Sequence, residues 1–290
     1  MIKTRVLGNS GLEVSEIAFG GMSLGQDHQE NEKIIHQAID LGINFFDTAD
    51  LYDQGFNEET IGKALFNKRK EVFISSKVGN VLNPDGKTWH WGPNKAYMLK
   101  AVEDSLRRLQ TDYLDLYQLH GGTIEDPIDE IIEAFELLKE SGKIRAYGIS
   151  SIRPNVIREY IQRSNISSVM SQYSALDRRP EESVLGALQE SGIGVLSRGG
   201  LARGILVNKP AKPYLSYSEE QVAELKKRWS QHGDPLKASL QFVLQHDAIT
   251  TAVLGIRSVD QLQGIVKAYQ ELKPIKELFL LPPNTYENHR

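Results

Sequence analysis

The chain has 290 residues, which is enough to bury a large core in one large domain or two small ones. Hydrophobic residues make up 40% and charged residues 25%, and the formal net charge is -4, so no basic surface for nucleic acid or an anionic membrane is indicated. The absence of cysteine excludes disulfides, thiolate metal sites and a cysteine nucleophile. At the N-terminus, MIKTRVLGNSGLEVSE lacks the apolar region of a signal peptide, and no apolar run approaches the ~20 residues of a membrane span, so we expect a soluble, cytoplasmic protein.

The first predicted element is a β-hairpin in TRVLGNSGLEVSE, whose Asn-Ser-Gly sequence is typical of a tight turn. Eight β-rich runs are then predicted as strands. They are VSEIAFGGM (14–22), NFFDTA (44–49), VFISSKV (72–78), YLDLYQLH (113–120), IRAYGISS (144–151), VMSQYSAL (169–176), GVLSRGG (194–200) and TTAVLG (250–255). Amphipathic segments lie between them, as in IDEIIEAFELLKESG, where Gly142 stands at the expected end of a helix.

Strand signals that alternate with helical ones favour parallel βαβ units, and eight such units in roughly 250 residues indicate a (β/α)8 TIM barrel of the α/β class. A doubly wound sheet is second choice, because no GxGxxG follows the first strand. The hairpin is expected to plug the bottom of the barrel. Residues 201–233 are a longer insertion, and the tail ELKPIKELFLLPPNTYENHR is expected to pack across the barrel or over its mouth. No repeat or linker is visible, so residues 1–290 are interpreted as one domain.

Several predicted strands end in chemically useful side chains, and barrel active sites form at the C-terminal ends of strands. These side chains are Asp47 and Tyr52 after the second strand, Lys77 on the third, His120 on the fourth, Ser150 and Ser151 on the fifth, Gln172 on the sixth and Arg198 on the seventh. Taken singly, each has a structural explanation: an isolated Asp is usually a turn or helix cap, a Lys a solvated charge and a His a core residue. Their joint occurrence at one rim favours an active site.

The four side chains at the ends of strands two to four can reduce a carbonyl group if a hydride is supplied. A Lys beside a carboxylate stays charged, and a nearby ammonium favours proton release from a phenol. Tyr52 can then protonate a developing alkoxide, while Asp47 holds Lys77. A neutral His120 can hydrogen-bond the same carbonyl oxygen and orient it.

The segments GINFFDTADLY, SSKVG and DLYQLH, in this order, closely resemble the aldo-keto reductase superfamily, and LGNSGLEVSEIAFGGM resembles its N-terminal hairpin and first strand. The resemblance covers essentially the whole chain. It implies a (β/α)8 barrel with an N-terminal β-hairpin, NADPH as hydride donor, and no metal. Its catalytic tetrad falls on Asp47, Tyr52, Lys77 and His120.

The same resemblance implies the cofactor contacts. The amide of the nicotinamide is expected at Ser150, Ser151 and Gln172, with Ser151 where many members have Asn. Further contacts of NADPH or NADP are implied at Gly21, Met22, Asp47, Arg198, Gly200, Arg203, Gly255, Arg257, Ser258 and Gln261.

Two departures from the family pattern bear on the cofactor. Arg198 stands where many relatives have an aromatic residue that stacks on the nicotinamide, and its flat guanidinium can also stack on a ring. Gly264 and Ile265 replace the acidic and amide residues that contact the adenine, so that end of the cofactor is held by fewer groups. Arg257 is expected to bind the 2′-phosphate, although it can instead form an ion pair with the nearby Asp260.

The substrate is expected to be a small carbonyl compound. Trp89 and Trp91 lie on the long loop after the third strand, where they can either pack in the core or wall the substrate beside His120. The expected function is NADPH-dependent reduction of aldehydes or ketones, without nucleic-acid or membrane partners and with an undetermined oligomeric state.

Two other functions stay open on the sequence. One is a barrel lyase or isomerase that uses Lys77 as a Schiff base, or a metal held by Asp47, Asp50 and His120. The other is a non-catalytic partner module that senses a nicotinamide cofactor.

Overall fold

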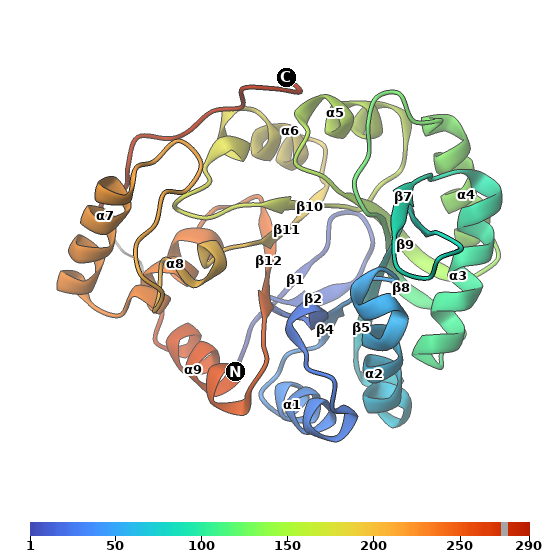
Figure 1. Ribbon diagram of the computed structural model, residues 1–290, viewed down its shortest axis with the longest axis horizontal. Coiled ribbons are helices and arrows are strands. Elements are labelled where there is room, and N and C mark those ends of the chain that lie inside the picture. Colours follow the sequence, from blue (N-terminus) through green and yellow to red (C-terminus); the bar gives the residue numbers. More distant parts are fainter. Residues whose placement is uncertain (274–277) are drawn as a thin grey trace.

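The computed structural model describes residues 1–273 and 278–290, and eight parallel strands in it form a closed barrel (Figure 1). Strands that are consecutive in the barrel follow one another in the chain, and the last pairs with the first. The strands are β3 (Ile17–Gly20), β4 (Phe45–Asp47), β5 (Phe73–Val78), β8 (Leu114–Leu119), β9 (Ile144–Ser150), β10 (Ser168–Gln172), β11 (Gly194–Arg198) and β12 (Ile249–Gly255). The predicted (β/α)8 barrel is therefore confirmed.

Helices surround the barrel and alternate with its strands (Figure 1). They are α1 (His28–Asp40), α2 (Phe56–Leu65), α3 (Lys95–Leu109), α4 (Ile128–Glu140), α5 (Pro154–Arg163), α6 (Val184–Glu190), α8 (Pro235–Leu244) and α9 (Val259–Gln270). Helix α4 shows why they form: Ile131, Phe135 and Leu138 recur at helical spacing and are buried. The helix stops before Gly142, which has a left-handed φ of 75°, as the sequence predicts.

The first predicted strand, residues 14–22, is in fact two strands. Residues 13–15 belong to an antiparallel hairpin of β1 (Thr4–Val6) and β2 (Glu13–Ser15), and the barrel strand β3 starts only after Glu16. The chain turns at Glu16, whose carboxylate accepts a hydrogen bond from Arg5 Nε at 2.6 Å. The sequence alone did not reveal this turn, because both strands bury side chains.

The hairpin closes the barrel at the N-terminal ends of its strands, and Figure 1 shows it within the ring of barrel strands. Leu7, Leu12 and Val14 are buried in the hairpin. They join an inner cluster with Ala18, Phe45, Leu116, Ala146, Met170, Leu196 and Val253 of the barrel strands. Gly8 lies so close that an added Cβ would be 2.2 Å from the carbonyl oxygen of Ser167. One end of the barrel is thus filled, as predicted, and the other end carries the polar residues.

Residues 201–233 form the predicted insertion between β11 and its barrel helix α8. The insertion contains an additional helix, α7 (Glu219–His232), which begins with a capping box between Ser218 and Gln221. An isolated bridge between Tyr214 and Tyr217 orders the loop in front of it. The insertion therefore brings Tyr214 to the mouth of the barrel.

In the tail, residues 278–290 follow one side of the mouth past α7 and α6 toward α5 (Figure 1). Asn284 accepts a hydrogen bond from the backbone of Arg178 at 2.8 Å, and the backbone of His289 accepts one from Asn155 at 2.9 Å. The expected packing over the mouth can be followed only here, since residues 274–277 lie outside the described residues.

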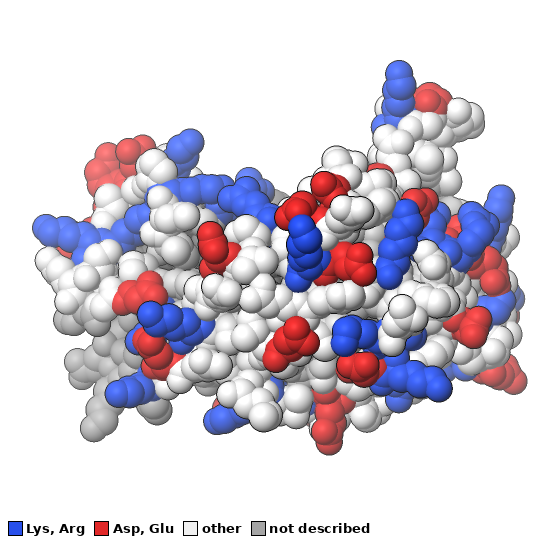
Figure 2. All heavy atoms as spheres, turned by 90° about the horizontal axis from the view of Figure 1, so that it is seen from below, with Lys and Arg blue, Asp and Glu red and all other residues white. Residues whose placement is uncertain are grey.

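The surface combines charges of both signs. Lys and Arg are interspersed with Asp and Glu over most of the face in Figure 2. Many exposed charges form ion pairs, as Lys95 does with Glu133 at 2.5 Å. Within the described residues, no helix has the length and apolarity needed to cross a bilayer.

Candidate active site

The predicted site residues gather inside the barrel at the C-terminal ends of its strands. Side chains alternate between the two faces of a strand, so a residue two positions beyond an inward apolar residue also points inward. Three strands show this pattern, with Phe45 followed by Asp47, Met170 by Gln172 and Leu196 by Arg198. The apolar layer above the hairpin is therefore followed by a polar layer.

Lys77 lies in this polar layer and is fully buried. Its ammonium donates to Asp47 Oδ2 at 2.7 Å and to the carbonyl oxygen of Thr48 at 2.7 Å. Burial works to lower the pKa of Lys77, but Asp47 and Tyr52 outweigh it, and the pKa of Lys77 is raised. Burial raises the pKa of Asp47, and Lys77 opposes that shift. The close contact favours the charged form of both, so Lys77 is a buried ammonium held by a carboxylate.

The chain after β4 folds back and places Tyr52 beside Lys77. The 3-10 turn η2 (Tyr52–Gly55) contains two left-handed residues, Asp53 with φ 47° and Gln54 with φ 55°. Such conformations in non-glycine residues are uncommon and cluster at functional sites. The turn sets the Tyr52 ring with its centroid 5.1 Å from Lys77 Nζ.

His120 follows directly after β8, and its backbone N–H donates to Val78 at 2.7 Å. Its ring lies edge-on to Tyr52, with the ring centroids 5.7 Å apart. Burial, with Lys77 and Arg198 adding to it, lowers the pKa of His120 to about 3. His120 is therefore neutral, and its buried Nδ1 has no partner among the described residues. The four predicted tetrad residues form one contiguous group.

Gln172 is fixed in a network that the sequence did not reveal. Its Nε2 donates to Asp177 Oδ2 at 2.8 Å and to the Tyr214 hydroxyl at 3.1 Å. Its Oε1 accepts from Arg198 Nη1 at 3.1 Å. Ser150 lies on the neighbouring strand, opposite Met170. Strands β9, β10 and β11 thus bring Ser150, Gln172 and Arg198 together.

Ser151 follows β9 and is buried, and its backbone N–H donates to Met170 at 3.0 Å. Its hydroxyl accepts a hydrogen bond from the backbone N–H of Arg153 at 3.2 Å, so part of its hydrogen-bonding capacity is used within the loop. The structure therefore places Ser151 beside Ser150, at the expected strand end.

The predicted phosphate end of the cofactor lies at the N-terminus of α9. Ser258 caps the helix by accepting from Gln261 N at 3.2 Å. Gln261 accepts from Arg257 N at 3.2 Å and donates to Gly255 O at 2.9 Å, so its side chain closes the loop. A hollow of about 420 Å³ beside this loop is lined in part by Arg257 and by Asn31 of α1.

This hollow offers groups that suit an anion. Free backbone N–H groups at a helix N-terminus bind anions, and a guanidinium binds phosphate in a forked geometry. Arg257 is exposed, and no ion pair joins it to a carboxylate in the part of the chain that the structure describes. The alternative partner, Asp260, lines the same hollow without pairing with it.

The remaining predicted cofactor contacts lie on loops after β3 and β11. Met22 is exposed, and Arg203 is exposed with a left-handed φ of 57°. Gly200 lies two residues after the end of β11. Packing also requires a glycine at position 21, because a Cβ added to Gly21 would be 2.9 Å from Asn57 Oδ1.

The aromatic loop after β5 is a second hairpin of β6 (Asn80–Leu82) and β7 (Trp89–Trp91). Trp91 lies against Gly79 and Gly121, where added Cβ atoms would be 2.7 and 3.3 Å from its ring. Its indole N–H donates to Asp126 Oδ1 at 2.8 Å. Since Gly121 follows His120, Trp91 packs against the backbone next to the tetrad. Trp89 is half-buried on the same strand.

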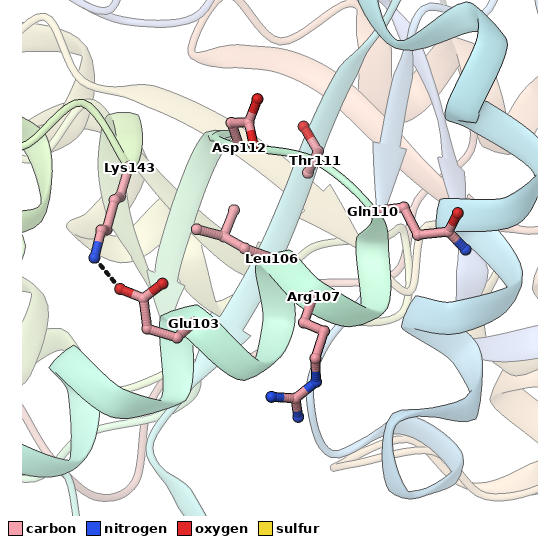
Figure 3. A pocket seen from close by; sticks show the side chains of 7 residues that line it. All are labelled: Glu103, Leu106, Arg107, Gln110, Thr111, Asp112 and Lys143. Atoms are coloured by element: carbon pink, nitrogen blue, oxygen red, sulfur yellow. Dashed lines mark hydrogen bonds and ion pairs between the residues drawn. The ribbon is translucent and has the colours of Figure 1, made fainter.

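Another hollow of about 420 Å³ lies at the opposite end of the barrel, beside α3 (Figure 3). It is lined by Glu103, Leu106, Arg107, Gln110, Thr111, Asp112 and Lys143. Lys143 pairs with Glu103 across it, as Figure 3 shows. None of the predicted site residues lines it, so the candidate site is the mouth.

The lyase and isomerase alternatives find less support in this geometry. Asp47, Asp50 and His120 do not form a metal-binding group, and no other such group of three His, Asp or Glu occurs in residues 1–273 and 278–290. The raised pKa of Lys77 leaves its amine protonated, which makes it a poor nucleophile for a Schiff base.

Comparison with known proteins gives consistent matches. A model of the aldo/keto reductase family matches residues 16–279. The oxidoreductase YqkF of Bacillus subtilis (strain 168) is 47% identical over 279 residues, which cover 92% of this chain and 91% of that protein. The NADP(+) aldo-keto reductase yakc of Schizosaccharomyces pombe is 36% identical over 222 residues, 73% of this chain and 65% of that protein. The holo form of aldo-keto reductase AKR11C1 from Bacillus halodurans has 48% identity, full coverage of both chains and a TM-score of 0.95.

Proposed function

The chain belongs to the aldo/keto reductase family, a family of oxidoreductases, and on this premise we propose that it reduces aldehydes or ketones to alcohols with NADPH. One observation carries the proposal. A buried ammonium, Lys77, is held by Asp47 beside a phenol, Tyr52, which lies edge-on to the neutral His120. This combination suits proton donation to an alkoxide in a site shielded from water.

In the proposed reaction, Tyr52 donates its hydroxyl proton to the carbonyl oxygen as negative charge develops there. The Lys77 ammonium stabilises the phenolate that remains, and Asp47 keeps Lys77 in place. Neutral His120 hydrogen-bonds the carbonyl oxygen and orients it. The nicotinamide cofactor, when bound, supplies the hydride to the carbonyl carbon.

The proposed cofactor runs from the centre of the mouth to α9. Ser150, Ser151 and Gln172 are proposed to hold its carboxamide. The other proposed contacts are Gly21, Met22, Asp47, Arg198, Gly200, Arg203, Gly255, Arg257, Ser258 and Gln261. NADPH is favoured over NADH by Arg257, which lies beside a helix N-terminus and has no ion-pair partner among the described residues. The NADP(+) in the name of the relative yakc supports the same choice.

The proposed substrate is a small carbonyl compound bound between His120 and the loop that carries Trp89 and Trp91. Trp91 is partly exposed and rests on Gly121, so its ring forms the wall nearest the tetrad. Trp89 lies two residues away on β7, where a flat apolar surface suits the carbon skeleton of an aldehyde or ketone.

The test is to replace Tyr52 with Phe and follow NADPH absorbance with a panel of aldehydes. Because general-acid catalysis contributes at least ~100-fold, we expect Tyr52→Phe to lower kcat by that factor or more while cofactor affinity stays nearly unchanged. Tyr113→Phe is the matched control. It removes a hydroxyl just before the N-terminal end of β8, far from the mouth, and should leave kcat unaltered.

Turnover retained in Tyr52→Phe would move the proton donor elsewhere and overturn the proposed mechanism. A single-turnover measurement on the unmodified protein separates the reductase from a cofactor-sensing module. The sensor would bind NADPH but transfer hydride negligibly.

A further inference from the structure

The guanidinium of Arg198 lies at the C-terminal end of β11, pointing inward and mostly shielded from water. Its hydrogen-bond acceptor is a neutral group, Gln172 Oε1, at 3.1 Å. No carboxylate lies within ion-pair distance of Arg198 in the part of the chain that the structure describes. The neighbouring Arg179, by contrast, is bound by Asp177 through two hydrogen bonds of 2.7 Å.

The other titratable groups around Arg198 are neutral or have an ion-pair partner of opposite charge. Lys77 is neutralised by Asp47 and Arg179 by Asp177, while His120 is neutral. Tyr52 and Tyr214 also lie near enough to act on Arg198, and so does Asp177 from its pair with Arg179. Arginine does not lose its proton in proteins, so Arg198 stays a cation that has no ion-pair partner among the described residues. Shielding from water makes that charge act strongly on nearby groups.

The reacting end of the cofactor must lie close to this charge. A carbonyl oxygen that receives the Tyr52 proton is within hydrogen-bond distance of the Tyr52 hydroxyl, and the hydride donor must approach the adjacent carbon to about 3–3.5 Å. Arg198 interacts electrostatically with Tyr52, Asp47 and His120, which together surround this position. A nicotinamide ring at this position would lie on the same rim of the barrel as the Arg198 guanidinium, which follows from the placement of Arg198 at the C-terminal end of β11 beside Gln172.

We propose that Arg198 makes the site bind the reduced cofactor more tightly than the oxidised one, so that NADPH is taken up and NADP+ is released readily. The inference rests on the proposed function. NADPH gives up a hydride, that is one proton and two electrons, to the carbonyl carbon, and its neutral dihydronicotinamide becomes a cation. The flat guanidinium can stack on the neutral ring and repels the cationic one.

The size of the effect follows from the distance between the charges. Two like charges about 5–6 Å apart in a partly shielded site repel strongly enough for a difference of roughly 10- to 100-fold in Kd after allowance for screening. The unmodified protein should therefore bind NADPH about 10- to 100-fold more tightly than NADP+.

The experiment is a fluorescence titration of NADPH and of NADP+ with the unmodified protein and two variants. Arg198→Met removes the charge but keeps an unbranched side chain, and Gln172 is still held by Asp177 and Tyr214. Arg198→Lys keeps the charge and serves as the rescue. Arg107→Met, which removes an exposed charge on α3, controls for net charge.

We expect the preference for NADPH to fall to near one in Arg198→Met, mainly through tighter NADP+, and to persist in Arg198→Lys and Arg107→Met. An unchanged ratio in Arg198→Met, or a ratio lost equally in Arg198→Lys, would overturn the inference while leaving the reductase proposal standing. Failure of the unmodified protein to bind either form would overturn both.

Discussion

At the residue scale, the group behind Lys77 contains a second acid that the tetrad does not use. Asp50 is buried, its Oδ1 has no hydrogen-bond partner among the described residues, and its Oδ2 receives a long contact of 3.5 Å from the Tyr97 hydroxyl. The nearby Glu58 is matched by Arg108 at 2.6 Å. Burial, with Glu58 adding to it, raises the pKa of Asp50 from 3.8 to about 7. Asp50 is thus a buried carboxyl that gains a charge near neutral pH.

Asp50 should therefore make the stability of the protein depend on pH. The unfolded chain releases this proton near pH 4 and the folded protein only near pH 7, so stability falls as the pH rises through that window. The difference corresponds to about 4 kcal/mol. In urea unfolding, Asp50→Asn should be more stable than the unmodified protein at pH 8 and nearly equal to it at pH 4.5.

Asp53→Asn is the control for this prediction, because Asp53 is exposed in the same turn and its left-handed φ of 47° suits asparagine. It should change stability little at either pH. If the gain of Asp50→Asn were the same at pH 4.5 and pH 8, ionisation of Asp50 would not be its cause.

At the element scale, α9 combines a packing face with an exposed N-terminus. Ile265 is buried in the core, and Gly264 has open space around it, so neither offers a polar group to an adenine. The weak adenine contacts expected from the sequence stay a prediction. At the N-terminus of α9, Arg257, Ser258 and the helix dipole become the main groups for this part of the proposed cofactor.

Arg257→Ala should accordingly weaken NADPH and leave NADH almost untouched. A charge-assisted bond to the 2′-phosphate contributes ~1.5–3 kcal/mol, which corresponds to roughly 10- to 150-fold in Kd. Titration of both cofactors measures it. Lys267→Ala removes an exposed cation in the last turn of α9 and should change neither the NADPH affinity nor the NADH affinity. Equal titration of NADPH and NADH by the unmodified protein would contradict the prediction.

At the scale of the whole molecule, the two ends of the barrel have separate tasks. The hairpin end is filled by apolar side chains, while the mouth carries buried charges with incomplete partners, which cost stability. TIM barrels generally place stability at the N-terminal face and chemistry at the C-terminal face. Substitutions in the hairpin should therefore affect unfolding without affecting turnover.

Leu7→Ala tests this separation. Leu7 is fully buried in the inner cluster, so its truncation should lower the free energy of unfolding by about 2–5 kcal/mol. The kcat of the folded fraction should stay unchanged. Val6→Ala in the same hairpin is the control, because Val6 is 52% exposed and its truncation should have little effect. A Leu7→Ala variant with normal stability but impaired kcat would contradict the division.

By itself, the sequence determined the barrel and the grouping of its candidate tetrad. Strand and helix periodicities are local properties, and a parallel barrel places all strand ends at one rim, so Asp47, Lys77 and His120 were predictable neighbours. Tyr52 was placed beside them by its position after the second strand, while the family resemblance added the expected cofactor contacts, whose roles stay predictions. The hairpin was also readable, from its turn and from its apolar residues.

Only the tertiary structure decided how these side chains are partnered. Gln172 contacts Tyr214, which is 42 positions away in the chain. Asp177 pairs with Arg179, while no carboxylate among the described residues pairs with Arg198. The break at Glu16 depends likewise on a contact with Arg5 across the hairpin. Such pairings depend on the path of distant loops and on which groups lose water. The charge left unmatched at Arg198 therefore appears only when the chain is folded.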